Sequence, residues 1–484
     1  MIVVNLFKAT KVPSGDPIKN GVTSEQDGNR SKFDVVLLSV RRLLSRGAVT
    51  NLANLIGRLH PADSARVIMH LSSSQEQCTV FELVEGERVR GEVLSELDAE
   101  TILHVLEDWN AADVAWLLRN IPDDDVAYIL GVLPEERAQE ILLLMKTDES
   151  QGVAHLMTYP KGTAGSIMTT EFLSLPEETT AQDALHCLQQ ATKAETVFYI
   201  YTTDPNGHLT GVLSLRALLG VAPTASLKSF LTRDPINVVV ETDQEEVARQ
   251  VANYNLLAIP VVEKDGRLAG IITVDDVVDV IQEEDTKDML KMAGASEEDA
   301  FMHISSLQAV RVRLPWLLTN LVGSLASGLI LWSFRYAIQE VVALVTFIPV
   351  VAAMGGNVGL QSSTLIIRGL ATGRVELSDL WKVLFRELRI GLLLGLVCGG
   401  LLVVGGWLWK GGAVLGLVVG VSLIVAFLLS VGLATLTPLL FKRFRIDPAV
   451  AAGPFITTAN DIYWGDHLPQ LSDSHARLSA VAVH

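Results

Sequence analysis

The most constraining feature of this 484-residue chain is a set of four apolar segments in its last third. Their bounds are Leu314–Trp332, Val341–Ile367, Ile390–Trp409 and Ala413–Phe441. Each is long enough to cross ~30 Å of hydrocarbon as a helix that rises about 1.5 Å per residue. Because an ordinary soluble core does not bury four such segments, the sequence predicts an α-helical transmembrane bundle.

A fifth apolar segment begins at Asp447-Pro448, where proline suits the first turn of a helix. From Ala449 to Ile462 there are only fourteen residues, which as a helix span ~21 Å, short of a full crossing. The sequence then becomes polar. We therefore expect a transmembrane domain over residues 313–462 with five helices, the fifth of them short, and an atypical polar tail over residues 463–484.

Basic residues orient these segments. They gather before the first segment, between the second and third, and between the fourth and fifth: Arg311, Arg313, Arg368, Arg374, Lys382, Arg386, Arg389, Lys442, Arg443 and Arg445. The opposite loops hold only Arg335 and Lys410. Because cytoplasmic loops are enriched in Lys and Arg, the pattern predicts a multi-pass protein of the cell (inner) membrane with its N-terminus in the cytoplasm.

The region before the apolar segments is acidic. Of the 38 Lys and Arg and the 55 Asp and Glu residues, 13 and 8 follow Val310, which leaves 25 basic and 47 acidic residues in the first 310. This balance disfavours nucleic acid as a partner and suits cations, although taken by itself it is explained more simply by a solubilising surface. Residues 1–32 lack the apolar core of a signal peptide, and we expect a disordered tail there.

Residues 33–160 show helical periodicity and an internal repeat. Asp113–Leu118 recurs twelve residues later as Asp125–Leu130, and Arg137–Leu142 is a weaker third copy. Proline followed by acids opens the second and third copies, as is typical of helix N-termini. The repeat predicts a stack of short helices, an all-α superhelical N-domain.

Residues 161–283 alternate short β-rich runs with helical ones and contain one pattern twice. The copies begin at Ile167 and Phe230, and each has a hairpin turn, at Asn206-Gly207 and Asp265-Gly266. This α/β tandem resembles a pair of CBS modules. The polar residues 284–312 are expected to form a connecting helix.

Two segments of the membrane region carry polar groups suited to a pore. The second apolar segment contains Gly355, Gly356, Asn357, Gly359 and Gln361. Glycines there either let helices approach closely or expose carbonyl oxygens, and the two amides, four residues apart, share a helix face. We interpret the set as pore-lining.

The fifth segment adds Pro454, which frees a carbonyl in the preceding turn, and Asp461, an acid in an apolar span. Such an acid marks an ion path by default. Mg2+ prefers oxygen ligands and is often held by one or two carboxylates, and no cluster of His or Cys favours a softer metal. Oxygen ligands alone leave Mn2+ open.

An acidic run follows the second module. Asp276, Asp279 and Glu283 share a helix face, as do Glu284 and Asp288. Like charges so placed repel one another, and a bound cation relieves that repulsion. A solvated acidic helix is the alternative.

The order of these parts resembles the MgtE family of magnesium channels, as do the motifs that run from Gly355 to Gln361 and from Asp447 to Asp461. The resemblance covers about residue 35 to Asp461. It implies a homodimer in the lipid bilayer with a pore between the protomers, and a pore aspartate, Asp461, that holds hydrated Mg2+. It also implies that cytoplasmic Mg2+ closes the channel at acidic sites, which fall on Asp243, Glu245, Asp276, Asp279, Glu284, Asp288 and Asp447.

Some family members bind ATP as a regulatory ligand, and Thr273 and Asp275 match their nucleotide signature. In the first module Arg216 stands where the ribose-binding acid would be, so we do not expect that copy to bind in this way.

Departures from the family include the short fifth segment and several positions where an acid would help a regulatory site: Ala112, Trp116, Asn255 and Lys287. We therefore expect fewer or weaker regulatory ions. Two alternatives remain, a transporter of Co2+, Mn2+ or Ni2+ and a non-conducting, membrane-anchored cation sensor. No apolar segment contains an HExxH zinc motif, so an enzyme is not expected.

Overall fold

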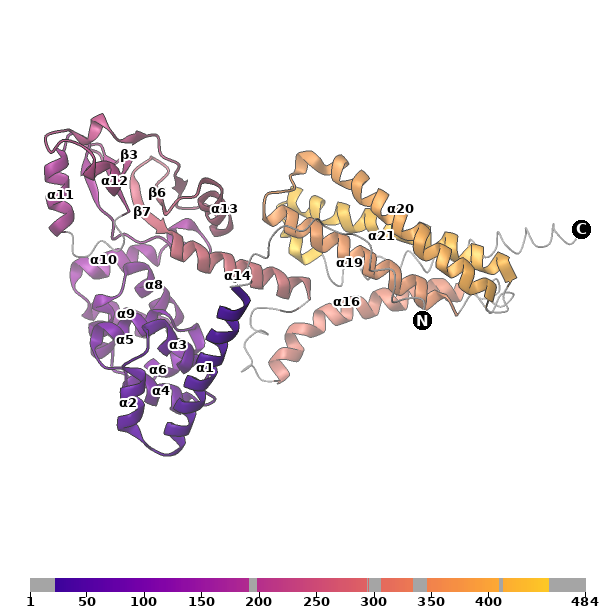
Figure 1. Ribbon diagram of the computed structural model, residues 1–484, viewed down its shortest axis with the longest axis horizontal. Helices are drawn as coiled ribbons and strands as arrows, with labels where there is room; N and C mark the ends of the chain where they lie inside the picture. The colour runs from indigo at the N-terminus through magenta and orange to yellow at the C-terminus, as the bar shows by residue number, and fades with distance from the viewer. Residues whose placement is uncertain are drawn as a thin grey trace, which may run out of the picture. The chain divides into compact units, whose positions relative to one another are not determined.

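The structure is a computed structural model that describes residues 22–190, 198–293, 295, 306–333, 346–408 and 412–451 (Figure 1). The chain divides into two compact units. The first holds the described residues up to Gln244 together with Leu256–Val274, and the second holds Glu245–Asn255 and the described residues from Asp275 onward. Predictions for residues 1–21, for the fifth segment beyond Ala451 and for the tail over 463–484 lie outside the described residues.

The first unit begins with a stack of helices. They are α1 (Val22–Ser45), α2 (Val49–Ile56), α3 (Pro61–Met69), α4 (Ser74–Glu82), α5 (Glu87–Ser95), α6 (Ala99–Leu106), α7 (Ala111–Leu117) with η1 (Leu118–Asn120), α8 (Asp123–Val132), α9 (Glu135–Leu144) and α10 (Thr147–Leu156). Helices α3, α5, α7 and α9 pack in succession, and α2, α4, α6, α8 and α10 form a second row. This confirms the all-α superhelical domain. Helix α1 begins inside the segment expected to be a tail.

Local sequence explains these short helices. Asp98 and Asn110 cap α6 and α7, because each side chain accepts a hydrogen bond of 2.8 Å from a backbone N–H in the first turn. Ile102 and Leu106, four residues apart on α6, are fully buried and hold that helix in the stack.

Two small sheets follow. The first has the order β1 (Ser174–Pro176), β2 (Tyr199–Thr203), β3 (Leu209–Ser214) and β4 (Thr232–Arg233), and the second has the order β5 (Val238–Val239), β6 (Ala258–Val262) and β7 (Leu268–Thr273). The helical elements are η2 (Ala164–Ser166), α11 (Ala181–Gln190), α12 (Leu215–Leu219), η3 (Leu227–Ser229), α13 (Gln244–Tyr254) and α14 (Val274–Met292). Gly207 and Gly266 have φ of 86° and 89° in the two hairpin turns, as the tandem repeat predicts.

Each module lends its first segment to the sheet of the other. Strand β4 pairs with β3 of the first sheet, while Thr169 exchanges backbone hydrogen bonds of 2.9 and 3.0 Å with Ile271 on β7. Glycine permits both approaches. A Cβ on Gly211 would lie 2.9 Å from the carbonyl oxygen of Thr232, and a Cβ on Gly270 would lie 2.7 Å from that of Thr169.

The second unit contains four helices long and apolar enough to cross a membrane, within the part of the chain that the structure describes. They are α16 (Ser306–Ser333), α19 (Ile348–Ala371), α20 (Leu380–Leu408), which follows η4 (Leu377–Asp379), and α21 (Gly412–Arg443), after which comes η5 (Pro448–Ala451). Each of them overlaps one of the four predicted segments, of which residues 341–345 and 409 lie outside the described residues. Of the segment 284–312, predicted as a connecting helix, the structure describes the end of α14 and the start of α16, and residues 294 and 296–305 lie outside the described residues.

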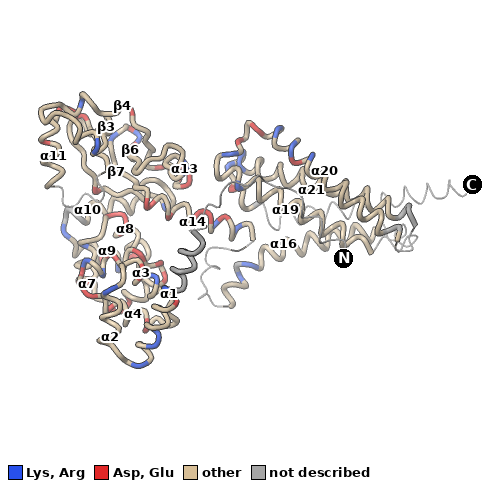
Figure 2. Tube along the Cα trace, viewed as in Figure 1, with Lys and Arg blue, Asp and Glu red and all other residues tan. Residues whose placement is uncertain are grey.

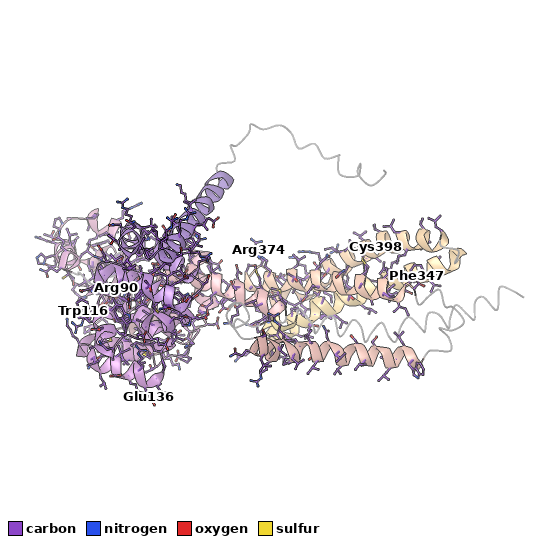
Figure 3. The ribbon with its side chains drawn as sticks, turned by 90° about the horizontal axis from the view of Figure 1, so that it is seen from below. Arg90, Trp116, Glu136, Phe347, Arg374 and Cys398 are labelled. Atoms are coloured by element: carbon purple, nitrogen blue, oxygen red, sulfur yellow. The ribbon has the colours of Figure 1, made fainter. Side chains whose placement is uncertain are left out.

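Helices α19 and α20 pack against α21. The core they enclose contains Val351, Val358, Val419, Leu423, Ala426, Phe427 and Val431, and Phe347 and Cys398 pack against it (Figure 3). On α20, Gly391, Gly395 and Gly399 face α21, and a Cβ on Gly399 would lie 2.7 Å from the carbonyl oxygen of Gly420. Small residues of this kind let apolar helices approach closely. Helix α16 is largely uncovered, with only 6% of its most apolar stretch buried.

Candidate functional site

Helix α19 carries the predicted glycine and amide residues and distributes them over two faces. Asn357 and Gln361 are both exposed on the single chain and share a face, as their spacing predicts. Gly355 and Gly359 are buried on the face that packs within the bundle, and Gly356 is half-buried. The amides therefore present hydrogen-bonding groups outward, while the two buried glycines face the bundle, and the pore-lining role of the set stays a prediction.

A buried carboxylate lies beside this segment. Glu387 on α20 is only 2% exposed, and one of its oxygens accepts a hydrogen bond of 3.1 Å from the Ser362 hydroxyl of α19. Its other oxygen lies 3.5 Å from a guanidinium nitrogen of Arg386. A charge in an apolar bundle is costly without such partners, so Glu387 links α19 to α20. It was not among the predicted residues; an acid at the start of the third apolar segment is the signal that marks it.

Helix α14 carries most of the predicted regulatory acids (Figure 2). Asp276, Asp279, Glu284 and Asp288 lie along it. Partial burial, and then the charge of Asp275 one turn away, raise the pKa of Asp279. The remaining predicted acids of this region, Asp243 and Glu245, are exposed at the start of α13.

The end of α14 meets the segment that follows α21. Met292 packs against the buried pair Ile367 and Ala449. The predicted acids Asp288 and Asp447 approach one another here: burial, and then the charge of Asp447, raise the pKa of Asp288 to about 6. Two predicted regulatory residues therefore lie near the C-terminal end of α19.

Both oxygens of Asp447 have partners at this junction. The Lys291 ammonium lies 2.5 Å from Oδ2, and the backbone N–H of Ala449 donates to Oδ1 at 2.8 Å. On the same face of α14, one turn earlier, Lys287 lies 3.3 Å from an oxygen of Glu284. Lys291 was not predicted, because its partner is 156 residues away in the sequence.

Other predicted residues do not come together. No group of three or more His, Cys, Asp or Glu side chains in the described ranges is arranged to hold a metal ion. Pro454 and Asp461 lie outside those ranges. Thr273 is buried at the end of β7, and Asp275 is exposed in the first turn of α14. Trp116, which stands where an acid was sought, is exposed on α7 (Figure 3).

Two hydrogen bonds fasten the helical stack to the modules within the first unit. The Thr170 hydroxyl donates to Asp123 at 2.6 Å, and the Tyr159 hydroxyl donates to Glu263 at 2.8 Å. Burial first, and the Glu263 carboxylate second, raise the pKa of Tyr159. The Tyr159 ring lies so close to Gly165 that a Cβ there would be 2.6 Å from it. The two parts are therefore mechanically joined.

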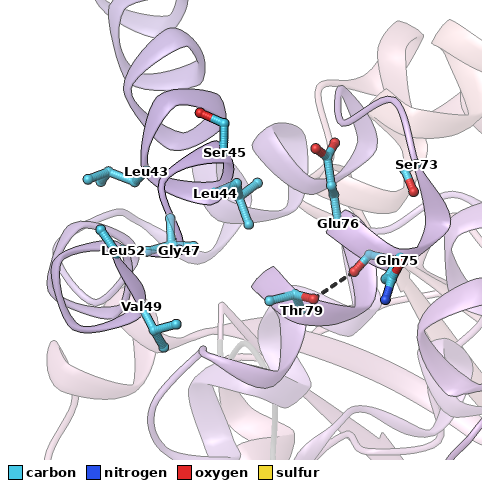
Figure 4. Close-up of a pocket in the computed structure, with 11 residues that line it drawn as sticks. Leu43, Leu44, Ser45, Gly47, Val49, Leu52, Ser73, Gln75, Glu76 and Thr79 are labelled. Atoms are coloured by element: carbon cyan, nitrogen blue, oxygen red, sulfur yellow. Dashed lines mark hydrogen bonds between the residues drawn. The ribbon is translucent and has the colours of Figure 1, made fainter.

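A surface pocket of 390 Å3 lies among the first helices of the stack (Figure 4). Leucine and valine side chains of α1 and α2 line it together with Glu76 and Thr79 of α4. None of the predicted site residues is part of it, and its lining offers no arrangement of acids that would take a cation.

Family models match the helical stack, the two modules and the membrane region of the chain. The family model MgtE, a divalent cation transporter, matches residues 348–463. The model of the MgtE intracellular N domain matches residues 59–162, and that of the CBS domain matches residues 164–223 and 227–283.

Similar proteins cover most of the chain. The magnesium transporter MgtE of Bacillus subtilis is 34% identical over 431 residues, which are 89% of this chain and 95% of that protein. The magnesium transporter MgtE of Thermus thermophilus is 38% identical over 312 residues, which are 64% and 69% of the two chains. A solved structure, the cytosolic domain of the Mg2+ channel MgtE in complex with ATP, is 33% identical with a TM-score of 0.47 and covers 50% of this chain and 99% of that one. The chain belongs to the MgtE family, whose members are magnesium transporters and not enzymes.

Proposed function

We propose that this chain is a Mg2+-selective channel that closes when Mg2+ binds its cytoplasmic N and CBS domains. The junction of α14 with Asp447 carries the proposal. Helix α14 leaves the second module directly, and its end packs against α19 and η5. A cation that relieves the repulsion between Asp288 and Asp447 therefore stabilises one arrangement of the module and the membrane helices. A ligand that binds one arrangement more tightly shifts the population toward it.

The pore in this proposal is lined by Asp461, Pro454 and the exposed amide face of Asn357 and Gln361. Asn357 and Gln361 are exposed within the part of the chain that the structure describes, and this amide face supports a homodimer in the lipid bilayer, because polar groups that face lipid are costly and a second protomer can cover them. The basic loops support a cytoplasmic N-terminus in the cell (inner) membrane. We also infer that ATP is a regulatory ligand of the second module, near Thr273 and Asp275.

Mg2+ uptake by proteoliposomes that contain the full chain tests the channel. Wild type should take up Mg2+ and lose that flux as Mg2+ rises on the face of the N and CBS domains. Asp461→Ala should abolish the flux, and Asp473→Ala, which removes an acid from the polar tail, should not. Flux that is changed neither by Asp461→Ala nor by the Mg2+ concentration on the face of the N and CBS domains would refute the proposal.

The short fifth segment favours a second candidate, a non-conducting cation sensor. A folded dimer without flux, whose N and CBS domains still become resistant to protease as Mg2+ rises, would support that candidate. Uptake of Mn2+, Co2+ or Ni2+ in preference to Mg2+ would instead indicate a transporter of another divalent cation.

A further inference from the structure

Helix α14 carries two lysines one turn apart, and each is paired with an acid of the proposed regulatory sites. Lys287 lies 3.3 Å from Glu284, and Lys291 lies 2.5 Å from Asp447. These are not freely solvated surface pairs, because each of the four side chains is between 21 and 37% exposed. Both ammonium groups therefore occupy positions close to carboxylates at which a metal ion would bind.

The carboxylates at this junction fit a divalent cation. The Lys291 ammonium of α14 lies 2.5 Å from Asp447, and the neighbouring Met292 packs against Ala449, so the acids at the end of α14 lie close to Asp447. Carboxylate oxygens are hard ligands of the kind that Mg2+ takes, often only one or two of them per ion.

The Lys291 ammonium lies close to the position beside Asp447 at which a metal ion would bind. Of the two oxygens of Asp447, Oδ1 already accepts the backbone N–H of Ala449 at 2.8 Å. The remaining oxygen, Oδ2, is the one that Lys291 contacts. A metal ion bound to this oxygen would lie next to the Lys291 ammonium, and the two positive charges would repel each other. Lys287 bears the same relation to one oxygen of Glu284.

We propose that Lys287 and Lys291 are tethered cations that compete with Mg2+ for the regulatory carboxylates and so raise the Mg2+ concentration at which the channel closes. The inference rests on the proposed function, because it concerns the same acidic sites. It also assigns a role to Lys287, which interrupts the acidic run. Its positive charge partly neutralises the carboxylates that a metal ion would otherwise neutralise. A partly exposed pair is worth at most about 1 kcal/mol, so removing one lysine should lower the half-effective Mg2+ concentration about threefold to fivefold.

Limited proteolysis of the purified full chain, titrated with Mg2+, tests the competition without relying on transport. In Lys291→Gln and Lys287→Gln the Mg2+ concentration that gives half-maximal protection should fall threefold to fivefold, and in the double variant it should fall further. Lys291→Arg retains the charge and should stay near wild type. Lys228→Gln breaks a comparable pair, the 2.5 Å contact with Glu177 on the first module, and should leave the value unchanged.

The outcomes separate this inference from the proposed function. If wild type is protected by Mg2+ and the glutamine variants need the same or a higher concentration, the lysines do not compete and the inference fails alone. If no form is protected at any Mg2+ concentration, closure by Mg2+ fails and the inference fails with it. Thermal melts in the presence of a chelator verify that each variant is folded. If Lys291→Gln does not fold, Lys287→Gln tests the competition independently.

Discussion

Replacing Gly399 with alanine should destabilise the contact between α20 and α21, whereas the same change at the adjacent Gly400 should not. A Cβ at Gly399 would lie 2.7 Å from the carbonyl oxygen of Gly420, and that oxygen belongs to the backbone and cannot rotate away. A Cβ at Gly400 would meet nothing within 4 Å. The two positions therefore differ in space, although they are neighbours on one helix.

The magnitude follows from the distance. Restoring a normal contact requires the helices to separate by about 0.7 Å at this point, and a gap of that size forfeits roughly a quarter to a half of the dispersion energy across it. Overpacking of this kind costs about 1–3 kcal/mol. Both substitutions gain the same helix propensity, ~1 kcal/mol. Their difference isolates the packing cost, and we expect Gly399→Ala to be less stable than Gly400→Ala by about 1–3 kcal/mol.

Unfolding of the full chain in mixed micelles, titrated with SDS and followed by far-UV circular dichroism, measures this difference. Matched unfolding curves for the two variants would show that α20 and α21 do not approach as closely as described. A Gly399→Ala variant that is the more stable of the two would contradict the packing argument outright.

Three further outcomes are expected. Tyr159→Phe keeps the ring but loses the 2.8 Å hydrogen bond to Glu263, so it should cost about 1 kcal/mol and speed proteolysis between the helical stack and the modules; unchanged digestion would count against a fastening role. The pKa of Asp288 is raised from 3.8 to about 6, so the folded chain binds this proton more tightly than the unfolded chain and gains stability as pH falls through 6 toward 4. In thermal melts with a chelator, the melting temperature of Asp288→Asn should be above that of wild type at pH 7.5 and equal to it at pH 4. A difference in melting temperature that does not change with pH would refute the assignment. Phe81→Ala empties a fully buried position and should destabilise the helical stack by about 3–5 kcal/mol in thermal melts, while Leu143→Ala, at a position 86% exposed, should leave the melting temperature unchanged.

Features encoded in short stretches were predictable from the sequence. The hairpins at Gly207 and Gly266, the repeated short helices and the first four apolar segments each depend on neighbouring residues, and all of these are found in the structure. Spacing also placed Asn357 and Gln361 on one face of a helix. It did not show which face of α19 packs inward, because that depends on where α21 lies.

Contacts between distant segments were not predictable. The ion pair of Lys291 with Asp447 joins residues 156 positions apart, and the hydrogen bond of Ser362 with Glu387 joins two separate helices. Glu387 stands out as an acid beside an apolar segment, but no local pattern identifies Ser362 as its partner or distinguishes Lys291 from other lysines. Only the packing of α14, α19 and α20 selects their partners.

The exchange of first segments makes each of the two modules dependent on the other. Neither sheet is complete on its own, since β4 of the second module finishes the first sheet and the Thr169 segment of the first finishes the second. A protein with a single module would have an open sheet edge and an unpaired first segment that could pair with the same edge of a second copy. Two copies satisfy both needs, so the present pair has the arrangement of a dimer of single modules. Severing the peptide link between the modules should therefore leave two fragments that recombine, because each still carries the piece that the other lacks.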